Sequence, residues 1–231
     1  MSTNTPTRFP KGVTNVPSDD QFRTLPVPDS TSVSEFVEDF HYWIAARWTV
    51  TDTGVNTQAP ADAEFGVLAV TLAAAAGNAS CIQKKGGSFT LETGRRVWFK
   101  GRFSLSAASD ADAVLGLQIT DTTPLAVSDG VWFSTSNGST NLDFHSAKGS
   151  VQQDVNAVAT LVNSTFVEVA FYWNGVNRIE AYVNDALVGV ITDIATYMPT
   201  HTLTASFGHA TTAGTANVMS VDFFHAVEER K

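Results

Sequence analysis

The chain contains a single cysteine among its 231 residues, few charged side chains and no long uninterrupted apolar run. Cys81 cannot form an internal disulfide, so the sequence does not require an oxidising compartment. The most apolar stretch, Phe65 to Ala76, is too short to cross a bilayer, and the N-terminus lacks the apolar core of a secretory signal. We therefore expect a fold that forms in a reducing cytosol and has no membrane partner.

Basic residues are also scarce, because 14 Lys and Arg stand against 23 Asp and Glu, for a net charge of −9. Nucleic-acid binding depends on many cations that neutralise phosphates, so we expect no nucleic-acid partner. A chain of this length is sufficient for one large β domain, whose core would need neither a metal nor a disulfide. The polar positions are filled mainly by Thr, Ser, Asn and Gly, a surface common on β-rich proteins that contact other proteins.

The sequence shows no long helical stripe with apolar residues at i, i+3, i+4 and i+7, and Gly77-Asn78 ends its one alanine run. Apolar and polar residues instead alternate in short segments separated by turns. This pattern predicts strands over residues 35–42, 48–51, 65–72, 79–84, 97–105, 114–120, 131–134, 142–145, 155–161, 167–173, 178–183, 187–191, 203–208 and 219–227. So many short strands in one domain, residues 35–231, predict an all-β sandwich or barrel.

A three-stranded meander is the best-supported local structure. Val167 to Trp173 alternates and stops at Asn174-Gly175, a strong hairpin signal. Arg178 to Val183 forms the return strand, and Asn184-Asp185 then turns into a third strand. We predict three consecutive antiparallel strands here.

Residues 1–34 differ from the rest, because they hold five of the eight prolines. Proline removes a backbone donor and fixes φ, so this stretch predicts an extended N-terminal arm. Two interpretations remain open: a disordered tail, or an arm that lies across a neighbouring surface through apolar contacts. For the second interpretation the candidate contact residues are Arg8, Phe9, Pro10, Val13, Val16, Phe22 and Leu25.

Motifs for cofactors and metals are absent. Lys84-Lys85-Gly86-Gly87 has neither the spacing of a phosphate-binding loop nor a following helix, and it is interpreted as a turn. The five histidines are scattered, so we expect them at strand ends or in satisfied core networks: His41, His145, His201, His209 and His225. Asp121, Asp129 and Asp143 could supply oxygens to calcium, but no loop has a calcium-ligand rhythm. We predict no cofactor and no metal site.

Glycoside hydrolysis is the enzyme class tested most closely, because it needs two carboxylates that flank a cleft. Glu38 and Asp39 are adjacent and would point to opposite faces of a strand, and Glu35 lies too far from Asp39. Glu168 and Glu180 are single acids on separate strands. No nucleophile elbow or catalytic triad is evident either, so the sequence predicts no catalytic residue and no enzymatic activity.

A possible contact face lies on the strand at residues 97–105. Alternation places Trp98, Lys100 and Arg102 together, on the side away from Phe99 and Phe103. A basic patch beside an exposed tryptophan on an acidic protein would suit a contact surface, and a solvated sheet face is the simpler alternative. Exposed tryptophans could also stack on sugar rings.

The hairpin described above resembles one found in laminin-G-like and concanavalin A-like sandwiches. The resemblance rests on residues 171–175 and 178–185. The first strand and turn of that superfamily are similar to Phe36 to Phe40 followed by Trp48 to Val50. Its closing strand is similar to Val218 to Val227. The resemblance implies an antiparallel jelly-roll β-sandwich with an N-terminal arm.

A narrower resemblance is to structural proteins that decorate the heads of tailed bacteriophages. It rests on four segments: Arg8 to Val13, Ile82 to Gly86, Val97 to Phe103 and Gly116 to Pro124. The resemblance implies a homotrimer on the outer capsid surface of the virion that cements neighbouring major capsid proteins. It also implies assembly in the host cytoplasm. The alternative is a carbohydrate-binding module of a capsid or tail fibre that binds a glycan through Trp98, Trp132 or Tyr172.

Overall fold

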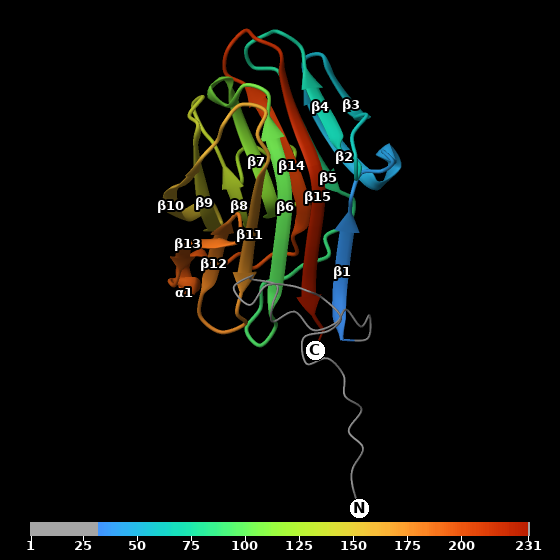
Figure 1. Ribbon diagram of the computed structural model, residues 1–231. Helices are drawn as coiled ribbons and strands as arrows, with labels where there is room; N and C mark the ends of the chain where they lie inside the picture. The colour runs from blue at the N-terminus through green and yellow to red at the C-terminus, as the bar shows by residue number, and fades with distance from the viewer. Residues whose placement is uncertain (1–31, 231) are drawn as a thin grey trace, which may run out of the picture.

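Two antiparallel sheets packed face to face make up the described part of the chain, residues 32–230 of a computed structural model (Figure 1). Sheet A contains β1 (Val33–Glu38), β3 (Asn56–Pro60), β4 (Leu68–Leu72), β6 (Val97–Leu105), β11 (Val167–Trp173), β12 (Ile179–Val183), β13 (Ala186–Ile191) and β15 (Asn217–Glu229). Sheet B contains β2 (Trp48–Thr53), β5 (Ala79–Lys84), β7 (Ala111–Gln118), β8 (Gly130–Ser134), β9 (Asn141–Lys148), β10 (Val151–Thr160) and β14 (Thr204–Thr211). Helical structure is limited to η2 (Ala45–Arg47), η3 (Ala108–Asp110) and α1 (Ile194–Tyr197) in these residues.

The strand order explains which segments meet. Sheet A runs β13-β12-β11-β6-β15-β4-β3, with β1 paired to the other half of the long β15, and sheet B runs β10-β9-β8-β7-β14-β5-β2. All pairs are antiparallel. The β11-β12-β13 meander confirms the sequence prediction, and the all-β sandwich is confirmed as a whole.

The core lies between the sheets and follows from period-two alternation. On β6 and β11 the inward side chains include Phe99 and Phe171, whose rings stack 5.1 Å apart between centroids. Nearer β1, Phe40 packs edge-on against Phe207 and Phe224 with centroids 5.7 and 6.1 Å away. Large aromatic side chains thus fill the interior, as expected for a core that needs no disulfide.

Most predicted strands are present, with three informative differences. The strand predicted over 35–42 ends at Glu38, and two residues later the backbone of Phe40 adopts a left-handed φ of 52°, outside the regular β region. β3 was missed, since the polar sequence Asn56–Pro60 lies at the edge of sheet A. β10 begins at Val151, four residues before its predicted start, and is also a mostly exposed edge strand.

Candidate functional site

The residues of the predicted contact face lie together on the outer face of sheet A, but the tryptophan is not exposed and the cations are not free. Trp98, Lys100 and Arg102 point outward from β6, opposite Tyr172, Ala170 and Glu168 of β11. Trp98 is fully buried, which corrects the prediction that it is exposed. The Tyr172 ring stacks on it at 5.4 Å, and the Arg96 guanidinium lies 5.1 Å from its ring centroid.

The two cations of this face are paired within their own sheet. Lys100 Nζ lies 2.6 Å from a carboxylate oxygen of Glu168 and 3.1 Å from one of Asp185, and Arg102 binds the Asp222 carboxylate. Burial raises the pKa of Glu168, and the bond from Lys100 opposes that rise. Local pairing therefore accounts for these charges, and their role as a contact face for another protein stays a prediction.

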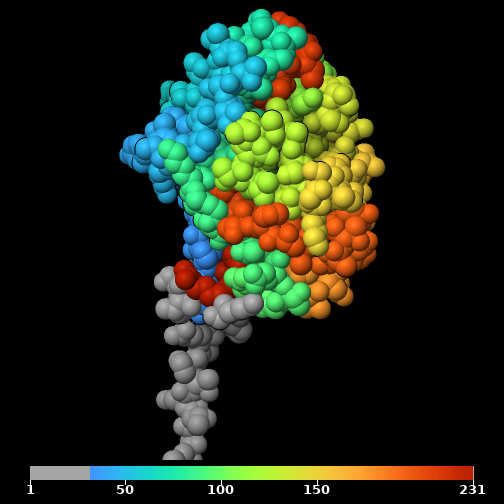
Figure 2. Space-filling view, turned by 180° about the vertical axis from the view of Figure 1, so that it is seen from behind, coloured from blue at the N-terminus to red at the C-terminus, as the bar shows by residue number. Residues whose placement is uncertain are grey.

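Part of the outer face of sheet B is covered by a segment of the same chain. The segment 119–129 follows β7 and folds back over the sheet, where Val127 packs against Val114, Trp132 and Ala147. In Figure 2, which shows this side, yellow-green atoms lie across the middle of the face. Trp132 is only 5% exposed, so the structure does not support it as a stacking platform for a sugar ring.

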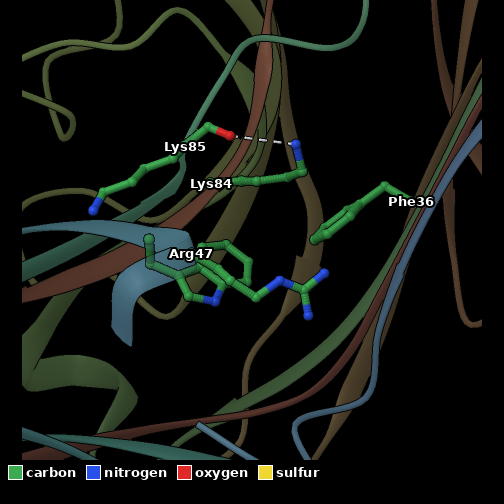
Figure 3. Close-up of a pocket in the computed structure, with 5 residues that line it drawn as sticks. Phe36, Arg47, Lys84 and Lys85 are labelled. Atoms are coloured by element: carbon green, nitrogen blue, oxygen red, sulfur yellow. Dashed lines mark hydrogen bonds between the residues drawn. The ribbon is translucent and has the colours of Figure 1, made fainter. Parts of the chain in front are cut away.

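A pocket of about 270 Å³ opens at the other edge of the sandwich, where β1 approaches β2 and β5. Its lining residues are two aromatic and three basic side chains, namely Phe36, Arg47, Trp48, Lys84 and Lys85 (Figure 3).

Strand pairing assembles this pocket from three separate segments of the chain. Trp48 pairs with Lys84 across β2 and β5, and the backbone N–H of Lys85 donates to Arg47 O at 2.9 Å. In Figure 3, Arg47 and Lys84 extend towards Phe36, whereas Lys85 extends away from it. Trp43 stacks on Trp48 with the ring centroids 6.0 Å apart and so supports the aromatic wall from behind.

The pocket carries an excess of positive charge. Lys84 Nζ lies 5.3 Å from the Phe36 ring centroid and donates to Ser88 Oγ at 3.0 Å. Burial, and then the neighbouring Arg47 cation, lower the pKa of Lys84. Arg47 is paired with one acid, Glu38, at 3.4 Å, and burial raises the pKa of this carboxyl group. Three cations against one carboxylate favour an anionic group at this position.

Sequence reasoning missed this site although it noted Lys84 and Lys85. The Lys84-Lys85-Gly86-Gly87 segment is a turn as predicted, but its function in the pocket depends on Arg47 and Phe36. Those residues lie 37 and 48 positions before Lys84, and only the β1, β2 and β5 arrangement brings them close. The adjacent Lys84 and Lys85 were the one feature of the sequence that pointed to this pocket.

The acidic residues considered for calcium are used locally. Asp121 accepts from the backbone N–H of Thr123, Asp129 from that of Gly149, and Asp143 from that of Ala157. Within residues 32–230 no group of three or more His, Cys, Asp or Glu side chains could hold a metal ion. No helix in this range is long and apolar enough to span a membrane.

Cys81 is buried, and burial followed by the charge of Asp52 raises the pKa of its thiol to about 12. Such a thiol is unreactive at neutral pH. The predicted arm contacts, Arg8 to Leu25, lie outside the described residues.

Comparisons with known proteins identify a fold. No family model and no curated protein matches the chain. Among solved structures, a β-1,3-1,4-glucanase (lichenase) derived from a mouse hindgut metagenome is similar over 84% of this chain and 98% of its own, with a TM-score of 0.62 and 14% identity. An endo-β-1,4-glucuronan lyase from the fungus Trichoderma reesei matches 83% of this chain and 94% of its own, with a TM-score of 0.58 and 12% identity. The carbohydrate recognition domain of Emp47p matches 87% of this chain and 98% of its own, with a TM-score of 0.57 and 10% identity.

The fold is a concanavalin A-like jelly roll. This confirms the fold that the sequence resemblance implied.

The comparisons also correct the prediction that the chain is not an enzyme. Most of the similar structures are glycoside hydrolases or lyases built on this same sandwich. At identities of this size the likeness shows the fold alone, and the fold is one that supports enzymatic activity. The sequence argument relied on acidic pairs and motifs that are visible along the chain, and it could not detect residues that only strand pairing brings together.

Proposed function

We propose that this jelly-roll domain binds an acidic carbohydrate in the pocket lined by Phe36, Arg47, Trp48, Lys84 and Lys85. The observation that carries the proposal is a pocket lined by three basic side chains, of which Arg47 and Lys84 extend towards Phe36, in a chain whose net charge is −9. Arg and Lys side chains suit the carboxylate of a uronic acid. Phe36 and Trp48, which are 7% and 3% exposed, form an apolar base beneath these cations rather than a stacking platform.

The size of the pocket limits the ligand. A volume of about 270 Å³ lies just below the usual range for ligand pockets, roughly 300–1,000 Å³. We therefore expect one uronic acid residue of an oligosaccharide to be held, with the rest of the chain outside. Neighbours of this fold include a carbohydrate recognition domain and a lyase named for glucuronan, which supports the choice of ligand class.

Tryptophan fluorescence tests the proposal, because Trp48 lines the pocket and Trp43 stacks on it. Titration with a β-1,4-linked oligoglucuronate should change the emission in a saturable manner, and the neutral β-glucan oligosaccharide of equal length should bind at least about tenfold more weakly. Arg47→Gln and Lys85→Gln should each weaken binding by about three- to tenfold.

Lys148→Gln is the matched control, since it removes the same charge from the distant end of β9. Equal affinity of wild type and both pocket variants would overturn the proposal. So would equal binding of the charged and neutral oligosaccharides.

Capsid decoration is the second candidate. Tyr42 and Ile44 lie in one loop and are 80% and 49% exposed. Phe65 is 77% exposed and lies near this loop, because the next residue, Gly66, packs against the backbone of residues 39–41. Exposed apolar residues that gather in this way favour a protein partner. On this reading the chain would bind the major capsid protein as a homotrimer at the outer surface of the virion.

Co-sedimentation with undecorated expanded heads, together with solution mass by light scattering, tests the capsid reading. Deletion of residues 1–31, which leaves β1 complete, should weaken attachment and leave the domain folded. Attachment that does not change on deletion would contradict a role for the arm.

A further inference from the structure

A hydrogen-bonded chain of a serine, a histidine and an aspartate lies on the outer face of sheet B. Ser134 Oγ is 2.8 Å from His145 Nε2, and His145 Nδ1 is 2.7 Å from Asp154 Oδ1. The three residues come from β8, β9 and β10, the edge of sheet B opposite to the basic pocket. Their positions, 134, 145 and 154, form no sequence motif, and strand pairing alone brings them together.

The direction of the hydrogen bonds follows from the chemistry of the carboxylate. An ionised Asp154 can only accept, so the proton of a neutral His145 ring must lie on Nδ1. Nε2 then carries a free lone pair and accepts the hydroxyl proton of Ser134. This is the arrangement in which an imidazole acts as a general base towards a serine.

Neighbouring side chains hold the base in this orientation. The Trp132 ring stacks on the His145 ring with centroids 5.0 Å apart and an interplanar angle of 21°. Gln152 Nε2 donates to Asp154 Oδ1 at 3.0 Å and fixes the carboxylate. The His145 side chain is 9% exposed, whereas Ser134 is partly open to solvent, so the nucleophile can be reached and its base is shielded.

We propose that Ser134 is a nucleophile, with His145 as its general base and Asp154 as a positioning residue, and that the site cleaves small carboxylic esters. Ser134 Oγ forms a bond to the ester carbonyl carbon as its proton passes to His145 Nε2. The ester C–O bond then breaks, and that proton goes to the leaving alcohol. Water adds to the acyl carbon and gives a proton to Nε2. The bond to Ser134 breaks, its oxygen regains that proton, and the carboxylic acid leaves.

The surroundings of Ser134 indicate a short acyl group. The side chain is partly buried, and the bulge of β10 between Val155 and Ala159 lies close by, where Ala157 N donates to Asp143 Oδ1. We therefore expect acetyl esters to react and long acyl chains to be excluded. The activity does not depend on the carbohydrate pocket, so either proposal can fail alone.

The test uses the full chain with p-nitrophenyl acetate and a fluorophosphonate probe. The probe should label the peptide that contains Ser134, and Ser134→Ala should abolish this label and lower the ester turnover at least about tenfold. Ser136→Ala, an exposed serine two residues away, is the matched control and should behave as wild type. A circular dichroism spectrum and a melting temperature like those of wild type confirm that Ser134→Ala is folded.

Asp154→Asn separates positioning from structure. The Asp154 carboxylate holds the His145 ring through Nδ1, so its loss should lower kcat for p-nitrophenyl acetate and leave KM close to that of wild type. Labelling elsewhere than at Ser134, or equal turnover by wild type and Ser134→Ala, would overturn the proposal. An unchanged kcat in Asp154→Asn would show that Asp154 does not position His145.

Discussion

At the scale of single residues, His209 shows what the sandwich interior does to a titratable group. Its side chain points inward from β14, level with Ala113 and Ser80, and is completely buried. Neither ring nitrogen has a hydrogen-bond partner, which corrects the expectation of a satisfied core network. Burial lowers the pKa of His209 from 6.5 to about 4, although the nearby Asn217 backbone opposes this shift.

The lowered pKa of His209 predicts acid sensitivity. The unfolded chain binds a proton here below pH 6.5 and the folded chain only below about pH 4, so stability falls as the pH drops through this window. The free energy of unfolding should decrease by about 3 kcal/mol over that range because of this residue. Urea unfolding of wild type and His209→Leu at several pH values measures it, and the two curves should diverge below pH 6.5. Parallel curves would contradict the assignment.

At the scale of elements, the segment 119–129 depends on Gln83 of β5. Gln83 Nε2 donates to Ile119 O at 2.9 Å and to Ser206 Oγ at 3.0 Å, and Asp121 N donates to Gln83 Oε1 at 3.0 Å. One buried amide thereby ties the covering segment to the sheet.

Gln83→Met should cost about 1–3 kcal/mol, because it keeps the side-chain volume but leaves the partly buried Ile119 carbonyl and Asp121 N–H without their partner. The covering segment should also loosen, so acrylamide should quench Trp132 more strongly. Thr49→Val, on the same face of the neighbouring β2, is the control and should change stability by less than about 0.5 kcal/mol. If Gln83→Met matched this control in stability and quenching, the segment would not depend on Gln83.

Sequence alone predicts the elements that have a clear two-residue period. It finds β6 and the β11-β12-β13 meander, including the turn in which Asn174 Oδ1 accepts from the backbone N–H groups of three following residues. It misses β3, which is polar on both faces, and it cannot know which strands pair. The pocket and the Ser134, His145 and Asp154 chain both arise from pairing between distant strands, so neither leaves a local motif.

At the scale of the whole molecule, the net charge of −9 and the basic pocket have opposite effects on an anionic ligand. The overall charge repels the ligand at a distance, whereas the pocket attracts it at contact. Short-range attraction of this kind is screened by salt, since the Debye length falls from about 10 Å at 0.1 M to about 3 Å at 1 M.

Ionic strength should therefore separate the two classes of sugar. Raising the salt from about 0.1 M to about 1 M should weaken binding of the oligoglucuronate several-fold and leave any binding of a neutral oligosaccharide unchanged. Isothermal titration calorimetry at both salt concentrations measures this. Identical salt dependence for the two ligands would exclude the cations as the source of affinity.

The most direct measurement of the central claim is lysine footprinting with and without saturating oligoglucuronate, read by mass spectrometry. The acylating reagent should modify Lys85 freely in the absence of the ligand, since its side chain is exposed, and bound sugar should protect it at least about fivefold. Lys148, at the far edge of sheet B, should react equally in both samples. Equal modification of Lys85 with and without the sugar would contradict the assignment of the pocket as the carbohydrate site.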